Sequence, residues 1–124
     1  MNIEELREYC LSVKGANESF PFDETVLVFK VMNKMFAYTS IDPSEDGFWV
    51  SVKCDPEKAI DLRERYTAVI PGIHANKKLW NSINQEGDMS DIEIKQWIDH
   101  SVEEVINKLP KKQQEIYKNM ANEE

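Results

Sequence analysis

The stretch TVLVFKVMNKMFAYTS, residues 25–40, decides the fold. Its two halves, residues 25–31 and 34–40, are rich in β-branched and aromatic side chains, and Met32 and Asn33 separate them. Such side chains favour strands, so the pattern predicts a β-hairpin with a tight turn. Asn tolerates a positive φ better than most residues, and we expect Asn33 to adopt one in this turn.

The segment that follows extends the hairpin into a meander. A polar loop, DPSEDG at residues 42–47, leads into FWVSVK at residues 48–53. Successive side chains of a strand point to opposite faces. One face of this third strand therefore carries Phe48, Val50 and Val52. Three consecutive antiparallel strands are predicted.

Three helices are expected around the meander. Asn2 can cap the first, whose apolar residues recur at helical spacing, and Gly15 ends it. The second begins at Asp55, which can accept an N-terminal backbone N–H. The third begins at Ser90, which forms a capping-box pattern with Glu93. Its apolar stripe consists of Ile94, Ile98, Val102, Val105 and Leu109.

Two further short strands, residues 67–70 and 79–84, complete the pattern. The order of elements predicts an α+β fold, in which an antiparallel β-sheet has helices packed on one face. We expect a single domain over residues 1–110. Pro110 interrupts the last helix, and residues 111–124 would form a short C-terminal helix or a flexible tail.

Composition narrows the function classes. The chain has 124 residues and a formal net charge of −8, so its overall field repels phosphate polymers and acidic membrane surfaces. Any nucleic-acid contact must come from a local basic patch. The N-terminus lacks the pattern of a signal peptide, and no apolar run approaches the roughly 18 residues of a membrane span. We therefore expect a cytoplasmic protein without a membrane role.

No catalytic motif is present in the sequence. GxSxG, HExxH, P-loop and GxGxxG patterns are all missing, and the chain has only two histidines. Cys10 and Cys54 are far apart and favour buried, reduced thiols. Nothing in the sequence marks Cys54 as an activated partner of His74. We expect no enzyme activity, catalytic residue, metal site or cofactor.

The motif HANKKLW, residues 74–80, is the first candidate site. Lys77 and Lys78 offer ammonium groups, His74 and Asn76 offer hydrogen bonds, and Trp80 offers an apolar face. Proteins that recognise phosphates and bases use these side chains. The alternative is a solvated turn that enters a strand, with Trp80 in the core.

Three lysines in the predicted strands form a second candidate. Lys30, Lys34 and Lys53 lie among apolar neighbours, and strand alternation can bring some of them together on the open face of the sheet. The alternative is that they solvate the sheet or protect its edge. A third cluster is acidic, and its default interpretation is a solvated surface: Glu4, Glu5, Glu8, Asp42, Glu45 and Asp46.

Three segments together carry a family resemblance. PFDETVLVFKVMNKMFA (residues 21–37), KCDPEKAIDLRERY (residues 53–66) and PGIHANKKLWNSI (residues 71–83) resemble the MmcQ/YjbR family of small bacterial proteins. The resemblance implies a fold similar to that of CyaY and frataxin, and it implies DNA binding. The positions that match the family pattern are Lys30, Lys34, Lys53, His74, Asn76, Lys77, Lys78 and Trp80.

The function we expect is a non-enzymatic module that binds nucleic acid through this local lysine, His74, Asn76 and Trp80 surface. Lysines would neutralise phosphates, and Trp80 would stack on a base. The acidic net charge should make binding to DNA weak and salt-sensitive. The alternative is a module that binds a protein partner or a small anion through the same surface. A metal-binding role of the acidic first helix, by analogy with frataxin, ranks third.

Overall fold

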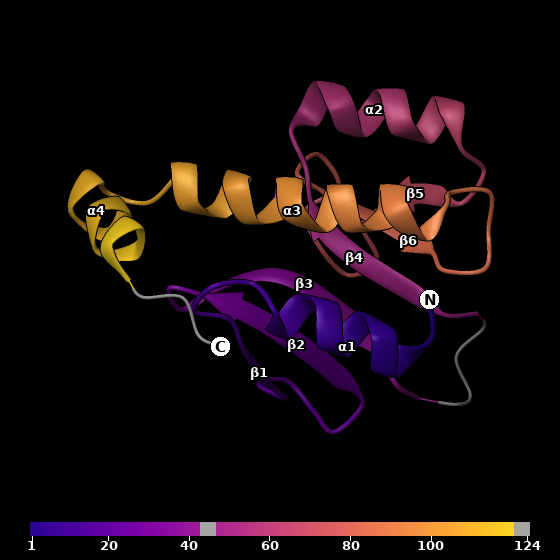
Figure 1. The fold of residues 1–124 in the computed structure, drawn as a ribbon. Coiled ribbons are helices and arrows are strands. Elements are labelled where there is room, and N and C mark those ends of the chain that lie inside the picture. Colours follow the sequence, from indigo (N-terminus) through magenta and orange to yellow (C-terminus); the bar gives the residue numbers. More distant parts are fainter. Residues whose placement is uncertain (43–46, 121–124) are drawn as a thin grey trace.

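The computed structural model describes residues 1–42 and 47–120 and shows a six-stranded antiparallel sheet with strand order β1-β2-β3-β4-β6-β5 (Figure 1). The predicted α+β class is confirmed. The elements are α1 (Ile3–Leu11), β1 (Asn17–Ser19), β2 (Val26–Val31), β3 (Lys34–Ser40), β4 (Trp49–Lys53), α2 (Pro56–Arg65), β5 (Val69–Pro71), β6 (Trp80–Asn84), α3 (Asp91–Asn107) and α4 (Lys111–Asn119).

The hairpin at the centre of the prediction forms as expected. Asn33 has a φ of 62°, and Met32 before it has a φ of 50°. Two consecutive residues in the left-handed region suit the two-residue turns whose twist matches that of the flanking strands. A bulge between Phe29 and Lys30 shifts the register near this turn.

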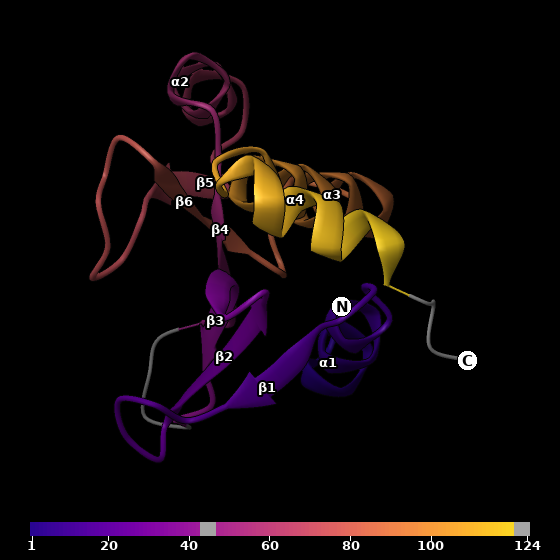
Figure 2. The same cartoon turned by 90° about the vertical axis from the view of Figure 1, so that its left-hand side faces the viewer.

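The core lies between the sheet and the helices. Leu27, Phe29, Val50 and Ile83 face it from the sheet, and Ile98 faces it from α3. Figure 2 shows α1, α3 and α4 on one side of the sheet. The prediction of helices on one face is therefore confirmed, and the opposite face carries loops instead of helices.

Two features of the sheet were not predicted. β1 is a polar segment of three residues, NES, without any strand pattern, and it forms by pairing with β2. β6 lies between β4 and β5. The helix α2 connects β4 to β5, and the chain then turns back so that Trp80 pairs with Lys53.

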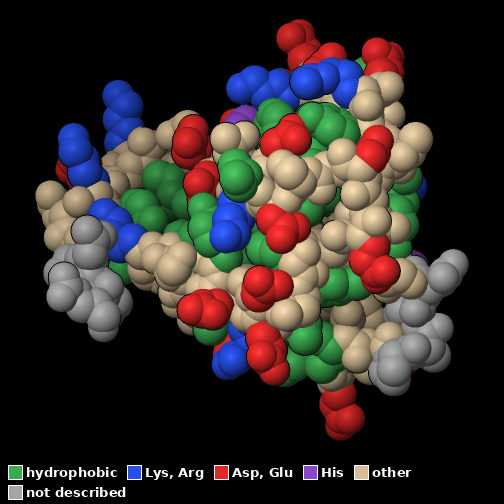
Figure 3. All heavy atoms as spheres, turned by 45° about the vertical axis from the view of Figure 1, so that its right-hand side comes forward, with side chains coloured by type: hydrophobic (Ala, Val, Ile, Leu, Met, Phe, Trp, Pro, Cys, Tyr) green, Lys and Arg blue, Asp and Glu red, His purple; other side chains and the backbone are tan. Residues whose placement is uncertain are grey.

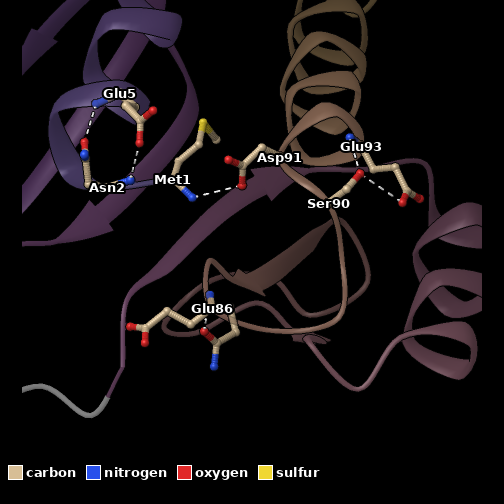
Figure 4. A network of polar contacts seen from close by, with 8 residues as sticks. Met1, Asn2, Glu5, Glu86, Ser90, Asp91 and Glu93 are labelled. Atoms are coloured by element: carbon tan, nitrogen blue, oxygen red, sulfur yellow. Dashed lines mark hydrogen bonds and ion pairs between the residues drawn. The ribbon is translucent and has the colours of Figure 1, made fainter.

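The predicted helix caps are confirmed. The side chains of Asn2, Asp55 and Ser90 each accept backbone N–H groups at the starts of α1, α2 and α3. The N-terminal ammonium group of Met1 lies 3.0 Å from a carboxylate oxygen of Asp91 and joins the start of α1 to the start of α3 (Figure 4). The N-terminal end of a helix dipole is positive, so it stabilises the carboxylates that lie at this end of the molecule.

The C-terminal segment includes a helix, α4, that contacts the rest of the chain. Tyr117 packs against the core cluster, and the Lys14 ammonium nitrogen lies 4.6 Å from the centre of its ring. Residues 121–124 of the predicted tail and residues 43–46 of the predicted polar loop lie outside the described residues, so Glu45 and Asp46 do as well. The domain boundary at residue 110 stays a prediction.

Candidate nucleic-acid interface

The lysines predicted on the strands meet at one end of the sheet. Lys30 lies near the end of β2, Lys34 begins β3 and Lys53 ends β4. Because these strands alternate in direction, the end of one lies beside the start of the next. The loop between β5 and β6, residues 72–79, enters β6 at the same end, since Trp80 pairs with Lys53.

Two of these lysines border a hollow of about 290 Å³, which we call the lysine hollow. Burial lowers the pKa of Lys53, and the nearby charges of Lys108 and Lys34 lower it further, while Glu104 opposes the shift. The like charges therefore lie close enough to repel one another. The residues around the hollow are Lys34, Met35, Lys53, Val105, Lys108 and Leu109.

Lys108 was missed by the sequence reasoning. It follows the last turn of α3, which packs over β3 and β4, and this packing brings it to the strand lysines. Lys111 and Lys112 open α4 a few residues later and are exposed. The sequence does show several lysines close together at the end of a predicted helix. It does not show that tertiary packing places this end of the helix beside the sheet.

Charge is unevenly distributed over the surface. Figure 3 shows Asp and Glu side chains spread over the middle of one face, with Lys and Arg side chains gathered toward α4 and α2. The acidic total of the chain therefore coexists with a locally basic region. Long-range repulsion of a polyanion is weakened there by the nearby lysines.

The loop of residues 72–79 is held firmly at its base. The Gly72 N–H donates to the Trp80 carbonyl oxygen at 2.8 Å. A Cβ at Gly72 would lie 2.6 Å from the Trp80 Cβ, so this close approach requires glycine. Asn76 closes the turn, since its side-chain oxygen accepts the Lys78 N–H at 2.9 Å. Its backbone oxygen accepts the Trp80 N–H, also at 2.9 Å.

The structure corrects the role assigned to Trp80. Its residue is only 8% exposed, and its ring packs against Tyr38 with 5.6 Å between ring centres. The loop lies over it because Gly72 approaches so closely. Trp80 therefore supports the loop from beneath and has no free face on which a base could stack.

The four polar residues of the loop differ in availability. His74, Asn76, Lys77 and Lys78 are all exposed. The Lys77 ammonium group donates to the Gly72 carbonyl oxygen at 3.2 Å, which holds it against the loop. His74 has a φ of 56°, an uncommon conformation for a non-glycine residue, and it points its side chain toward the helix-free face of the sheet.

Arg63 of α2 is a second residue that sequence reasoning missed. Its guanidinium donates to the Asn81 side-chain oxygen at 2.7 Å and to the Trp80 carbonyl oxygen at 3.3 Å. It also donates to the Lys77 carbonyl oxygen. Arg63 thus connects α2 both to the loop, at Lys77, and to the start of β6, at Trp80 and Asn81. The sequence shows only that Arg63 lies in the last turn of a predicted helix, and this does not indicate which residues it contacts.

The Cys54 and His74 pair is not brought together. Cys54 belongs to the core on the helix-covered face, whereas His74 borders the opposite face. Burial raises the pKa of the Cys54 thiol to about 12, and Asp55 and Glu104 add to the shift. A thiol with such a pKa is a poor nucleophile at neutral pH.

The comparison with protein families decides the relationship. The model of the YjbR family matches residues 11–103. This chain belongs to the YjbR family. The uncharacterized protein YjbR of Escherichia coli K12 is 32% identical to it over 116 residues, which cover 94% of this chain and 97% of that protein. The uncharacterized protein YbdF of Escherichia coli O157:H7 is 30% identical over 95 residues, 77% of this chain and 76% of that one.

Solved structures show the same YjbR-family fold. The crystal structure of Deinococcus radiodurans protein DR2400, described as a DUF419 domain, matches with a TM-score of 0.86 and 30% identity, covering 99% of this chain and 92% of that one. A protein from Pseudomonas syringae matches with a TM-score of 0.71 and 21% identity over 82% of this chain and 96% of its own. The similarity to CyaY and frataxin stays a prediction.

The described residues of this YjbR-family chain hold neither a candidate metal site nor a helix that could span a membrane. No group of three or more His, Cys, Asp or Glu side chains within residues 1–42 and 47–120 is arranged to hold a metal ion. No helix in the same part of the chain is long and apolar enough to cross a membrane.

Proposed function

We propose that this YjbR-family protein is a non-enzymatic module that binds nucleic acid at the lysine-bearing end of its sheet. The observation that carries the proposal is the crowding of Lys34, Lys53 and Lys108 around one hollow. Like charges held together raise the free energy of the unbound protein, and a phosphate between them would relieve that repulsion. The exposed Lys78 lies in the loop that enters β6 at the same end of the sheet and adds a further positive charge there.

Binding should be weak and steeply dependent on salt. Each lysine that neutralises a phosphate adds about 0.7–0.9 to the slope of log affinity against log salt concentration. Three lysines therefore predict a slope of about −2 to −3. The acidic charge of the rest of the molecule reduces the affinity further, especially at low ionic strength, where screening is weak.

Fluorescence anisotropy with labelled single- and double-stranded oligonucleotides, at about 50 and 200 mM salt, tests the proposal. The key variant is Lys34→Gln/Lys53→Gln. The matched control is Arg65→Gln/Lys95→Gln, which removes the same charge elsewhere: Arg65 pairs with Asp61, and Lys95 lies over the Tyr9 ring. We expect the key variant to lose about two units of salt slope, and the control to keep the slope of the natural protein.

Three outcomes would contradict the proposal. One is the absence of any oligonucleotide binding at the lower salt concentration. Another is an equal loss of binding in both double variants, which would mean that only the net charge matters. The third is binding of inorganic phosphate at the lysine hollow without binding of oligonucleotides, which would favour the small-anion alternative.

A further inference from the structure

A groove of about 450 Å³ lies on the helix-free face of the sheet. Figure 2 shows the loop between β5 and β6 and the loop between β1 and β2 projecting on the side away from α1, α3 and α4. These loops supply the two walls of the groove, and β3 and β4 supply its floor. We call it the aromatic groove, and its lining includes Phe22, Met35, Tyr38, Ser51 and His74.

The wall that carries His74 is fixed to the floor by a chain of hydrogen bonds. Tyr38 donates its hydroxyl to the Ile73 carbonyl oxygen. The Ile73 N–H donates to the Ser82 hydroxyl at 3.0 Å, and that hydroxyl lies 2.6 Å from the hydroxyl of Ser51. Such a network holds the groove open before any ligand arrives, which lowers the entropy cost of binding.

The opposite wall presents aromatic side chains to solvent. Phe22 is 69% exposed, and Phe20 in the same loop is 48% exposed. Asp23 fixes this loop, because one of its carboxylate oxygens accepts the N–H and hydroxyl of Thr25, each at 2.8 Å. The backbone N–H of Thr25 is the main cause of the lowered pKa of Asp23. An exposed Phe22 beside a groove offers a surface on which a planar ring can stack.

The aromatic groove and the lysine hollow adjoin one another. Met35 lines both of them. Lys53 and Lys34 therefore lie beyond one end of the groove, while Asp23 lies at the start of β2, toward the other end. Phe22 precedes Asp23 and so lies at this second end, and β3 runs from Lys34 to Ser40 between the two ends, a span of about 20 Å. A single nucleotide is too short to reach both ends. A single strand of several nucleotides matches this polarity, with a base at Phe22 and the phosphate of another nucleotide at the lysines, because its bases are free to leave the stack.

We propose that the aromatic groove takes a base of a single-stranded nucleic acid, with Phe22 as the stacking residue and the lysine hollow as the phosphate site. This inference rests on the proposed function and adds to it a preference for single strands over duplexes. In a duplex, the bases are paired and stacked, and placing one in the groove requires unstacking it at a cost of a few kcal/mol. Single strands should therefore bind more tightly than duplexes of equal length. Phe22 takes the role that the buried Trp80 does not fill.

The test compares four probes on the full chain at about 50 mM salt, where phosphate contacts are strongest. The probes are a labelled single strand, the same strand with abasic sugars, its duplex, and a free mononucleotide as competitor. The variants are Phe22→Ala and Phe22→Trp, with Ile92→Ala as the control. Ile92 is exposed to a similar extent as Phe22, at the start of α3.

We expect Phe22→Ala to weaken single-strand binding about tenfold without changing the salt slope, because a stacked base is lost and no phosphate contact is. Phe22→Trp should retain or strengthen binding, and Ile92→Ala should leave it unchanged. Equal affinity for the abasic and normal strands would overturn the groove assignment while leaving lysine-dependent binding intact. Equal affinity for the mononucleotide would overturn the assignment to a strand. A complete lack of binding would remove both proposals.

Discussion

Lys53 links stability to function at the scale of one residue. Burial and two neighbouring lysines lower its pKa below the ordinary value of 10.5. Below its folded pKa, the lysine is charged in both states, and the folded state carries the penalty. As pH rises toward 10.5, the unfolded state binds more protons than the folded state, so stability rises and the penalty disappears.

Lys53→Gln should therefore make the protein slightly more stable at pH 7 and weaken nucleic-acid binding. The gain should be small, because the side chain is partly exposed to solvent, and it should shrink as pH approaches 10.5. Urea denaturation of both proteins between neutral and alkaline pH measures the gain. A loss of stability at pH 7 would show that Lys53 is a structural residue instead of a strained binding residue.

The cysteines give a second prediction at this scale. Burial raises the pKa of both Cys10 and Cys54 to about 12. At pH 8, we expect iodoacetamide to label them at least about a thousandfold more slowly in the folded protein than in urea. Mass spectrometry of timed samples provides the measurement. Fast labelling of native Cys54 would reveal an activated thiol and contradict the non-enzymatic assignment.

Individual residues also show the limit of sequence reasoning. The caps Asn2, Asp55 and Ser90 were predicted because their signals are local. The burial of Trp80 was only the alternative interpretation, because the sequence does not reveal that Gly72 lies against it. Phe22 was passed over in the same way, since its exposure depends on the path of a loop across the sheet.

At the scale of elements, the loop of residues 72–79 is held by α2. The three hydrogen bonds from Arg63 connect this helix to the loop and to β6. The sequence predicted the helix and the loop separately, because each has its own period or turn residues. Their connection arises only when β6 inserts between β4 and β5.

Arg63→Ala should destabilise the fold by about 2 kcal/mol, because it removes a half-buried charged donor and leaves the Asn81 side-chain oxygen without that partner. Arg65→Ala is the control, since its exposed pair with Asp61 is worth at most about 0.5 kcal/mol. Denaturant unfolding measures the change in the free energy of unfolding for both variants. The Arg63 variant should also bind nucleic acid more weakly, and an unchanged stability would show that the loop does not need α2.

The elements that were missed have weak local patterns. β1 contains only Asn17, Glu18 and Ser19, and it exists because β2 offers it an edge. Such a strand forms because a neighbouring strand offers it hydrogen bonds, and its own residues have no preference for strand structure. The longer strands and helices were predicted because their apolar periods extend over many residues.

At the scale of the whole molecule, the antiparallel topology separates charge. The ends of β2 and β4, the start of β3 and the end of α3 bring lysines to one pole. The starts of α1 and α3 bring carboxylates to the other, where Asp91 meets the N-terminal ammonium group. A chain with a net charge of −8 can therefore present a basic surface in one place. The sign of the total charge gave no information about this separation.

The most direct test of the central claim is a map of the binding surface. Backbone amide NMR spectra of the full chain, titrated with a short single strand at about 50 mM salt, provide it. We predict shifts concentrated at Lys30 to Met35, Lys53, residues 72–78 and Lys108, with Phe22 at the far wall of the groove. Shifts gathered instead around Glu86 and Asp91, or no shifts at all, would contradict the account.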